Sequence, residues 1–191
     1  MSFPQAVVIG GSAGAFEILR KILGALPRSL ACPVIIVVHL PPHSSGLAEV
    51  FGNETPLPVK QAEDKEPVEP GTIYIAPPSY HLLIESHRAF ALSADPPVHF
   101  SRPAIDVLFE AASDVYGADL VGILLSGASD DGAAGLQEIH RAGGITIVQA
   151  PSSADTAIMP AAALARFEPT HIGSPDEIVA GLNRLLNGSR A

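Results

Sequence analysis

Four short runs of apolar residues are continuous along the chain rather than alternating with polar positions. They cover residues 6–9, 34–38, 120–125 and 145–148. A run that is apolar at every position is typical of a strand with both faces covered, as in a parallel sheet between helices. The pattern therefore predicts four buried parallel strands.

Between these runs, apolar residues recur at three- and four-residue spacing, which predicts amphipathic helices. In the last of these segments Ser174 and Glu177 form a capping box, and Gly188 is placed to end the helix. The helices are predicted over about 16–26, from Pro103 onwards, over about 132–142 and from Ser174 to Gly188. Strands that alternate with helices favour a three-layer α/β/α sandwich on a mostly parallel, doubly wound sheet.

The middle of the chain has a different pattern. Residues 72–75, 80–84 and 89–92 are short strand-like segments with no helical pattern between them. We predict an antiparallel hairpin inserted in the sheet, with residues 85–88 as its turn. No repeat or long linker interrupts the sequence, so residues 1–191 are predicted to form a single domain.

The composition of the chain excludes some classes of partner and of cellular location. Apolar residues make up 47% of the chain, and 11 basic against 20 acidic residues give a formal net charge of −9. That charge disfavours nucleic acid and anionic membrane as partners. Cys32 is the single cysteine and no apolar run is long enough to span a bilayer, so we expect a cytoplasmic protein without direct membrane insertion.

Three chemically reactive residues follow three of the predicted strands. Ser12 comes after the first strand, His39 after the second, and Asp131 after the strand that begins at Leu120. The carboxyl ends of parallel strands share one edge of the sheet, where ligands bind. A hydroxyl nucleophile, a base and an orienting carboxylate are the groups needed for acyl transfer through a serine.

The segment around Ser12 matches Gly-x-Ser-x-Gly between a strand and a helix. Such a turn exposes the serine hydroxyl, and the N–H groups of the following helix can stabilise an oxyanion. The alternative is a glycine-rich phosphate-binding turn. Against it, the segment lacks both the dinucleotide pattern, because Ser12 and Ala15 replace glycines, and the Gly-Lys-Ser/Thr of a P-loop.

Each of the other two residues also has a simpler interpretation. His39 could bond a backbone carbonyl, and Asp130 or Asp131 could cap the following helix. His39 and His43 have the spacing of a zinc pair on a helix, but the two prolines between them exclude a regular helix, so no metal is expected. A triad of Ser12, Asp131 and His171 would follow the chain order of α/β-hydrolases and is ranked lower.

Five segments in the same order resemble the CheB family of chemotaxis protein-glutamate methylesterases. They are residues 7–14 around the serine, 38–42 around the histidine, 62–77 in the middle, 101–109 with Arg102-Pro103, and 122–135 around the aspartate, with Met159-Pro160 extending the series. Together they cover nearly the whole chain. The chain is thus similar to the catalytic domain of these enzymes.

The resemblance implies a cytoplasmic serine hydrolase that removes methyl groups from glutamate methyl esters on chemoreceptor helices, and deamidates glutamine there as well. It assigns the nucleophile to Ser12, the base to His39 and the orienting carboxylate to Asp131. It places the oxyanion-hole N–H groups at Ala13 and Ala128. No organic cofactor is implied. Arg102 is expected either to position substrate or to be an ordinary loop arginine.

The sequence departs from the family pattern in three places. The chain starts almost at the first strand, which predicts a catalytic domain without a receiver domain and control by a separate regulator. The family's Gly-Gly pair after the serine is Gly14-Ala15 in this chain. Residues 127–132 read Gly-Ala-Ser-Asp-Asp-Gly, without the family's methionine. These changes leave two rivals open, a serine esterase with another ester substrate and a non-catalytic signalling or docking module.

Overall fold

The central feature of the computed structural model, which describes residues 4–39 and 46–187, is a sheet of seven strands that all run parallel. In spatial order the strands are β3 (Val59–Gln61), β4 (Ile73–Ile75), β2 (Val34–Val38), β1 (Ala6–Gly11), β7 (Leu120–Leu124), β8 (Ile145–Gln149) and β9 (His171–Gly173). The five residues of β2 and of β7 and the six of β1 are all buried, as their continuous apolar pattern predicts.

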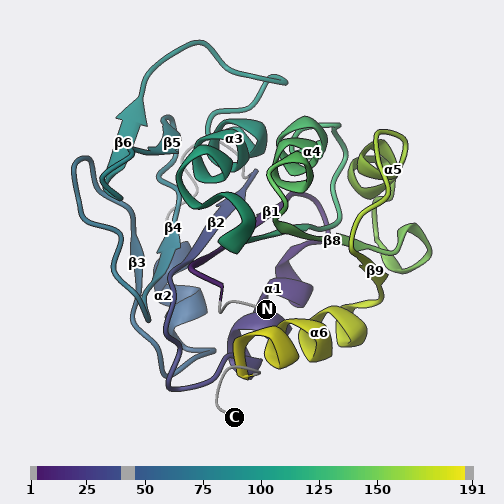
Figure 1. Cartoon of the computed structure of the whole chain (residues 1–191), viewed down its shortest axis with the longest axis horizontal. Coiled ribbons are helices and arrows are strands. Elements are labelled where there is room, and N and C mark those ends of the chain that lie inside the picture. Colours follow the sequence, from purple (N-terminus) through teal and green to yellow (C-terminus); the bar gives the residue numbers. More distant parts are fainter. Residues whose placement is uncertain (1–3, 40–45, 188–191) are drawn as a thin grey trace.

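Helices cover both faces of this sheet (Figure 1). One apolar core joins side chains of β1 such as Val7 and Ile9 to the helices α1 (Phe16–Ala25), α2 (Leu47–Gly52) and α6 (Pro175–Asn187). The other core joins Ala6 and Val8 to α3 (Ile105–Tyr116), α4 (Ala133–Arg141) and α5 (Ile158–Leu164). Alternate β1 residues thus enter opposite cores, and the three-layer α/β/α sandwich is confirmed.

The predicted hairpin is present and antiparallel. Its strands β5 (His81–Ile84) and β6 (Phe90–Ser93) pair with each other and form a two-stranded sheet of their own, so they do not add strands to the parallel sheet. Leu82, Ile84 and Phe90 of the hairpin are buried in the same core as α3. The apolar face that the alternation creates is therefore covered by a helix.

Some of the remaining helices and strands were predicted from the sequence and others were not. The helix expected from Pro103 begins at Ile105, and Glu177 accepts the Ser174 N–H at 2.8 Å, as a capping box requires. Gly188 lies outside the described residues. The pattern missed β3, α2, α5 and β9, because the strands have three residues each and the helices six and seven. Two 3-10 turns, Gly117–Asp119 and Pro151–Ser153, complete the described elements.

None of the helices in the described ranges is long and apolar enough to cross a membrane.

Candidate active site

The candidate site lies where the sheet changes direction of winding. From β1 the chain continues to β2 and β4 on one side of the sheet, and it later returns to β7, β8 and β9 on the other side. The segments that follow β1 and β7 therefore lead to helices on opposite faces of the sheet, and the point between such strands is the usual ligand position. Ser12 follows β1, His39 follows β2, and Asp131 ends the loop after β7.

The turn that carries Ser12 is held by hydrogen bonds from the loop after β7. The Ser12 N–H donates to the Ser126 carbonyl at 2.9 Å, and the Ser126 hydroxyl donates to the Ala13 carbonyl at 2.7 Å. Gly14 has a φ of 79°, a left-handed conformation that glycine adopts without steric cost. This turn leads into α1 and fixes the backbone of Ser12.

His39 lies beside Ser12 because their strands are in register. Gly11 pairs with Val38, and the His39 N–H donates to the Gly11 carbonyl at 3.1 Å. The residue after each strand thus reaches the same edge, on strands that are neighbours in the sheet. Ser12 and His39 are both partly exposed there, so substrate can approach them.

Asp131 is completely buried and receives three hydrogen bonds. Its carboxylate accepts the N–H groups of Ile105 at 2.7 Å and Asp106 at 2.9 Å, and His39 Nε2 lies 2.7 Å from Oδ2. An ionised carboxylate can only accept, so we assign the proton to His39 Nε2. Nδ1 of the neutral imidazole is then the nitrogen with a free lone pair, available to act as a base.

The same contacts decide between capping and orienting roles for Asp131. Asp131 precedes α4 but accepts N–H groups from the first turn of α3. Asp106, in that first turn, in return accepts the Gly135 N–H of α4 at 2.7 Å. Asp131 therefore both caps a helix and contacts His39. The helix that it caps is α3, and not α4, which follows it in sequence. Burial raises the pKa of the Asp106 carboxyl above its ordinary value.

The other predicted site residues differ in what the structure shows. Neither the Ala13 nor the Ala128 N–H donates to another residue within 4–39 and 46–187. Arg102 Nη1 donates to the Ala94 and Asp95 carbonyls at 2.8 and 2.9 Å. His171 lies on the edge strand β9, with β7 and β8 between it and β1, and the Asp131 carboxylate contacts His39, so the arrangement favours His39 over His171. His43 lies outside the described residues.

One group of side chains has the composition of a metal site. His99, Asp106 and Asp131 each offer a ligand atom, and these atoms lie within 4.8 Å of one another. Both oxygens of Asp131 already accept backbone N–H groups, and Asp106 Oδ1 accepts the Gly135 N–H. A cation could bind only in competition with these hydrogen bonds, so the cluster is suited to a hydrogen-bond network.

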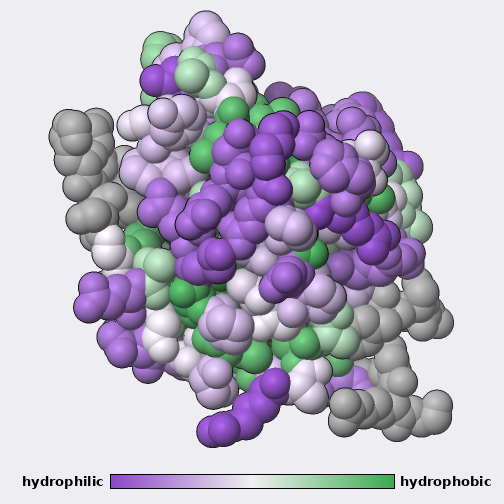
Figure 2. Space-filling model, turned by 90° about the vertical axis from the view of Figure 1, so that its left-hand side faces the viewer, coloured by the Kyte–Doolittle hydropathy of each residue, from purple (hydrophilic) through white to green (hydrophobic). Residues whose placement is uncertain are grey.

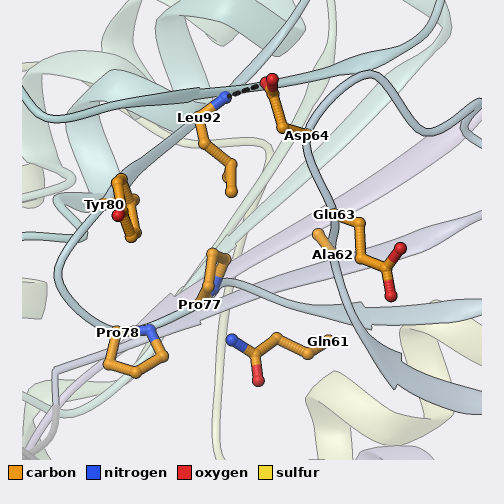
Figure 3. A pocket seen from close by; sticks show the side chains of 8 residues that line it. All are labelled: Gln61, Ala62, Glu63, Asp64, Pro77, Pro78, Tyr80 and Leu92. Carbon is orange, nitrogen blue, oxygen red and sulfur yellow. Dashed lines mark hydrogen bonds between the residues drawn. The ribbon is translucent and has the colours of Figure 1, made fainter.

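A separate hollow of about 420 Å³ opens at the carboxyl ends of β3 and β4. Figure 3 shows Tyr80, Leu92 and Pro77 around it, with the Asp64 carboxylate accepting the Leu92 N–H at 3.0 Å. Seen from the side of the molecule where β3 and β6 lie, the surface is mostly hydrophilic with hydrophobic residues between (Figure 2). None of the catalytic candidates lines this hollow.

Sequence reasoning did not identify Ser126 and Gln149, which support the serine turn. The Ser126 N–H donates to Gln149 Oε1 at 2.8 Å, and the Thr156 N–H donates to the Ser126 hydroxyl at 3.0 Å. Both residues are buried polar side chains at the ends of adjacent parallel strands. A serine and a glutamine directly ending apolar runs were the available signal, because buried polar groups need partners.

Comparison with known proteins finds one family over most of the chain. The model of the CheB methylesterase family matches residues 7–182. A protein of Leptospira interrogans named as a putative protein-glutamate methylesterase/protein-glutamine glutaminase is 42% identical over 185 residues, covering 95% of this chain and 94% of that protein. A Geobacter metallireducens protein-glutamate methylesterase/protein-glutamine glutaminase is 37% identical, and the match covers 95% of this chain and 53% of that protein.

The fold has a solved counterpart. The crystal structure of the Thermotoga maritima CheB methylesterase catalytic domain superposes with a TM-score of 0.90 at 29% identity, over 97% of this chain and 100% of that one. The match thus extends over nearly the whole chain. This chain therefore belongs to the CheB methylesterase family.

Proposed function

We propose that this chain hydrolyses glutamate methyl esters on chemoreceptors and uses Ser12, His39 and Asp131 as its catalytic triad. The observation that carries the proposal is the buried Asp131 carboxylate, which binds His39 Nε2 at 2.7 Å beside the turn of Ser12. Family membership supports the reaction, and the arrangement of residues supports the assignment of roles. We further propose that the chain acts on the cytoplasmic helices of the receptor and that a separate protein regulates its activity.

In the first half of the reaction, His39 Nδ1 takes the proton of the Ser12 hydroxyl as Oγ attacks the ester carbonyl carbon. The carbonyl oxygen becomes an oxyanion, for which the N–H groups of Ala13 and Ala128 are the proposed donors. Each donor of this kind is typically worth about 2.7–4 kcal/mol. When the tetrahedral intermediate collapses, His39 gives its proton to the departing methoxide, and methanol leaves.

In the second half, water replaces methanol. His39 Nδ1 removes a proton from the water, whose oxygen attacks the glutamyl ester of Ser12. Collapse of this second intermediate returns the proton to Ser12 Oγ and frees the glutamate side chain. A glutamine side chain would follow the same steps with ammonia as the leaving group. Asp131 keeps its negative charge throughout, holds the proton on Nε2 and stabilises the imidazolium.

The test is methanol release from chemoreceptor membranes that carry labelled methyl esters, with wild-type protein compared with Ser12→Ala. We expect release by the wild type and none above background by the variant. Hydrolysis of small esters without release from receptors would favour the esterase with another substrate. Equal behaviour of folded wild-type and variant protein in both assays would favour the non-catalytic module.

A further inference from the structure

The loop between β6 and α3 carries a tight turn with an unusual composition. Val98 and Ser101 exchange two backbone hydrogen bonds, at 2.8 and 3.1 Å, so His99 and Phe100 are the two central residues of a hairpin turn. Their φ angles are 49° and 60°. Positive φ at both central residues is the pattern of a type I′ turn, for which Asn-Gly is the preferred sequence. A phenylalanine in the second position is therefore strained.

The strained backbone is not compensated by burial of the aromatic ring. The Phe100 side chain is fully exposed, the most exposed large apolar residue in the described part of the chain. Burial would have offset the cost of the left-handed backbone, but solvent exposure adds a further cost. Strained residues persist when the surrounding structure holds them, and they gather at functional sites.

The surroundings of the turn do hold it. His99 Nδ1 lies 2.9 Å from Asp130 Oδ1, and Nε2 lies 3.3 Å from Asp106 Oδ2. Each ring nitrogen of His99 thus faces a carboxylate oxygen, one on Asp130 and one on Asp106. The turn is thus attached to the first turn of α3 and to the loop after β7, the two segments that also hold Asp131.

The base of the loop is fixed as well. The buried His81 ring joins its two ends, with Nε2 3.1 Å from the Pro96 carbonyl and Nδ1 accepting the Ala104 N–H at 3.2 Å. Arg102 donates to the Ala94 and Asp95 carbonyls across the same loop. In Figure 1 the loop extends beyond α3, away from the sheet. The loop is therefore a supported platform for the turn.

The turn also lies close to the catalytic residues. A ring nitrogen of His99 is within 4.8 Å of an Asp131 carboxylate oxygen, and Asp131 is itself in contact with His39. Phe100 is the next residue after His99. A fully exposed aromatic ring is in this way held one residue from the network around the triad.

We propose that Phe100 is a specificity-determining residue that contacts the protein substrate beside the esterified side chain, and that His99 is the positioning residue that holds it there. This inference rests on the proposed function. The partner it fits is an apolar side chain on the receptor helix next to the modified glutamate. A small ester has no neighbouring side chain for this ring to contact, so Phe100 favours protein substrates over small esters.

A single ring is a contact within a larger interface. Specific protein interfaces bury roughly 800 Å² per partner, far more than one phenylalanine supplies, so Phe100 alone cannot hold a second copy of the chain. Exposed aromatic residues at the centre of an interface are often the ones that contribute most to binding. The acidic charge of the chain also opposes its self-association.

The experiment compares two substrates, methyl-labelled chemoreceptor membranes and p-nitrophenyl acetate as a small ester. For Phe100→Ala we expect kcat/KM on receptor membranes to fall about tenfold, mainly through KM, with turnover of the small ester unchanged. Phe100→Tyr keeps the ring and should retain receptor activity. Ile172→Ala, a matched exposed apolar residue on the edge strand β9, should change neither substrate.

Phe100→Gly separates substrate contact from a structural role. Glycine removes the ring and fits the left-handed backbone, so its receptor activity should match that of Phe100→Ala while its Tm lies above that of Phe100→Ala by about 2 °C. A structural role predicts instead that activity follows stability. His99→Asn keeps a residue that tolerates positive φ but lacks the imidazole ring that reaches both carboxylates, and should lose receptor activity selectively and to a smaller extent.

The outcomes are distinguishable from a failure of the proposed function. If the wild type releases no methanol from receptors, the proposed function fails. If the wild type does so and Phe100→Ala releases it equally well, only the role of Phe100 is overturned. Equal losses on both substrates in His99→Asn would show that His99 acts on the triad rather than on the turn. A wild-type dimer that Phe100→Ala dissociates, with unchanged receptor kinetics, would assign the ring to self-association.

Discussion

Two tight turns near the candidate active site both require left-handed backbone, but they use different kinds of residue for it. The turn after β1 needs a left-handed residue and places Gly14 there, with a φ of 79°. The turn at 98–101 needs two such residues and places His99 and Phe100 there. The first turn follows local preference, and the second departs from it and is held by contacts with Asp106 and Asp130.

The difference separates two kinds of functional constraint. At Gly14 the backbone must pass close to other groups, since a Cβ there would lie 2.5 Å from Asp155 Cβ and 2.8 Å from Ser126 Oγ. At Phe100 a fully exposed, large side chain is kept at a position where a glycine would be more stable. Close packing thus requires a glycine at position 14, whereas Phe100 departs from the local backbone preference, and such departures are expected at functional sites.

The largest effect is expected at Asp131, whose carboxylate contacts His39 and accepts N–H groups from the first turn of α3. Asp131→Asn keeps the shape but removes the charge that fixes the His39 proton on Nε2, so kcat should fall about 10⁴-fold, as in serine-protease triads. Ester hydrolysis under saturating substrate measures it. Asp130→Asn, at a mostly exposed neighbour, should lose far less, under about tenfold. The reverse ranking would move the orienting role to Asp130.

A smaller effect is expected when the left-handed glycine of the first turn is replaced by a residue with a side chain. Gly14→Ala forces a side chain into a left-handed backbone that costs roughly 1–2 kcal/mol, apart from the contact with Asp155, so Tm should fall by about 2–8 °C. Activity should fall with it, because the turn carries Ser12. Calorimetry and ester turnover together test this expectation.

The matched control is Gly52→Ala, at the end of α2, where an added Cβ meets open space and no positive φ is required. This variant should be neutral or slightly more stable, by up to about 1 kcal/mol. If Gly14→Ala were as well tolerated as the control, the comparison between the two turns would lose its basis. The reverse exchange is Phe100→Gly, which should gain stability and lose substrate preference.

The smallest effect on ester turnover is expected at Ser126, whose hydroxyl donates to the Ala13 carbonyl in the first turn. Ser126→Ala removes the hydroxyl that bonds the Ala13 carbonyl and the Thr156 N–H, a loss of about 1–3 kcal/mol in the free energy of unfolding. Denaturant titration measures it, and ester turnover should fall only a few-fold because the glycine backbone is unchanged. Ser86→Ala, an exposed serine in the β5–β6 turn, is the control and should leave both quantities unaltered.

Much of the architecture could be predicted from the sequence because the signals are local. Continuous apolar runs indicate buried parallel strands, and residues that directly follow such strands must share one edge, which was enough to bring Ser12, His39 and Asp131 together. The hairpin was predicted from short strand-like segments with no helical pattern between them, but its separation from the main sheet depended on packing against α3. Segments of three residues, such as β3 and β9, carry too few positions for a pattern.

The sequence by itself determined the fold class, the order of the main elements and the three residues proposed for the triad, since periodicity and strand ends depend on neighbours in the chain. Tertiary structure alone decided that Asp131 accepts N–H groups of α3 and that His39 presents Nδ1, because these partners lie 25 to 92 positions away in sequence. It also decided that a strained turn is held next to them. Contacts between distant segments are set by packing, and packing has no local signature.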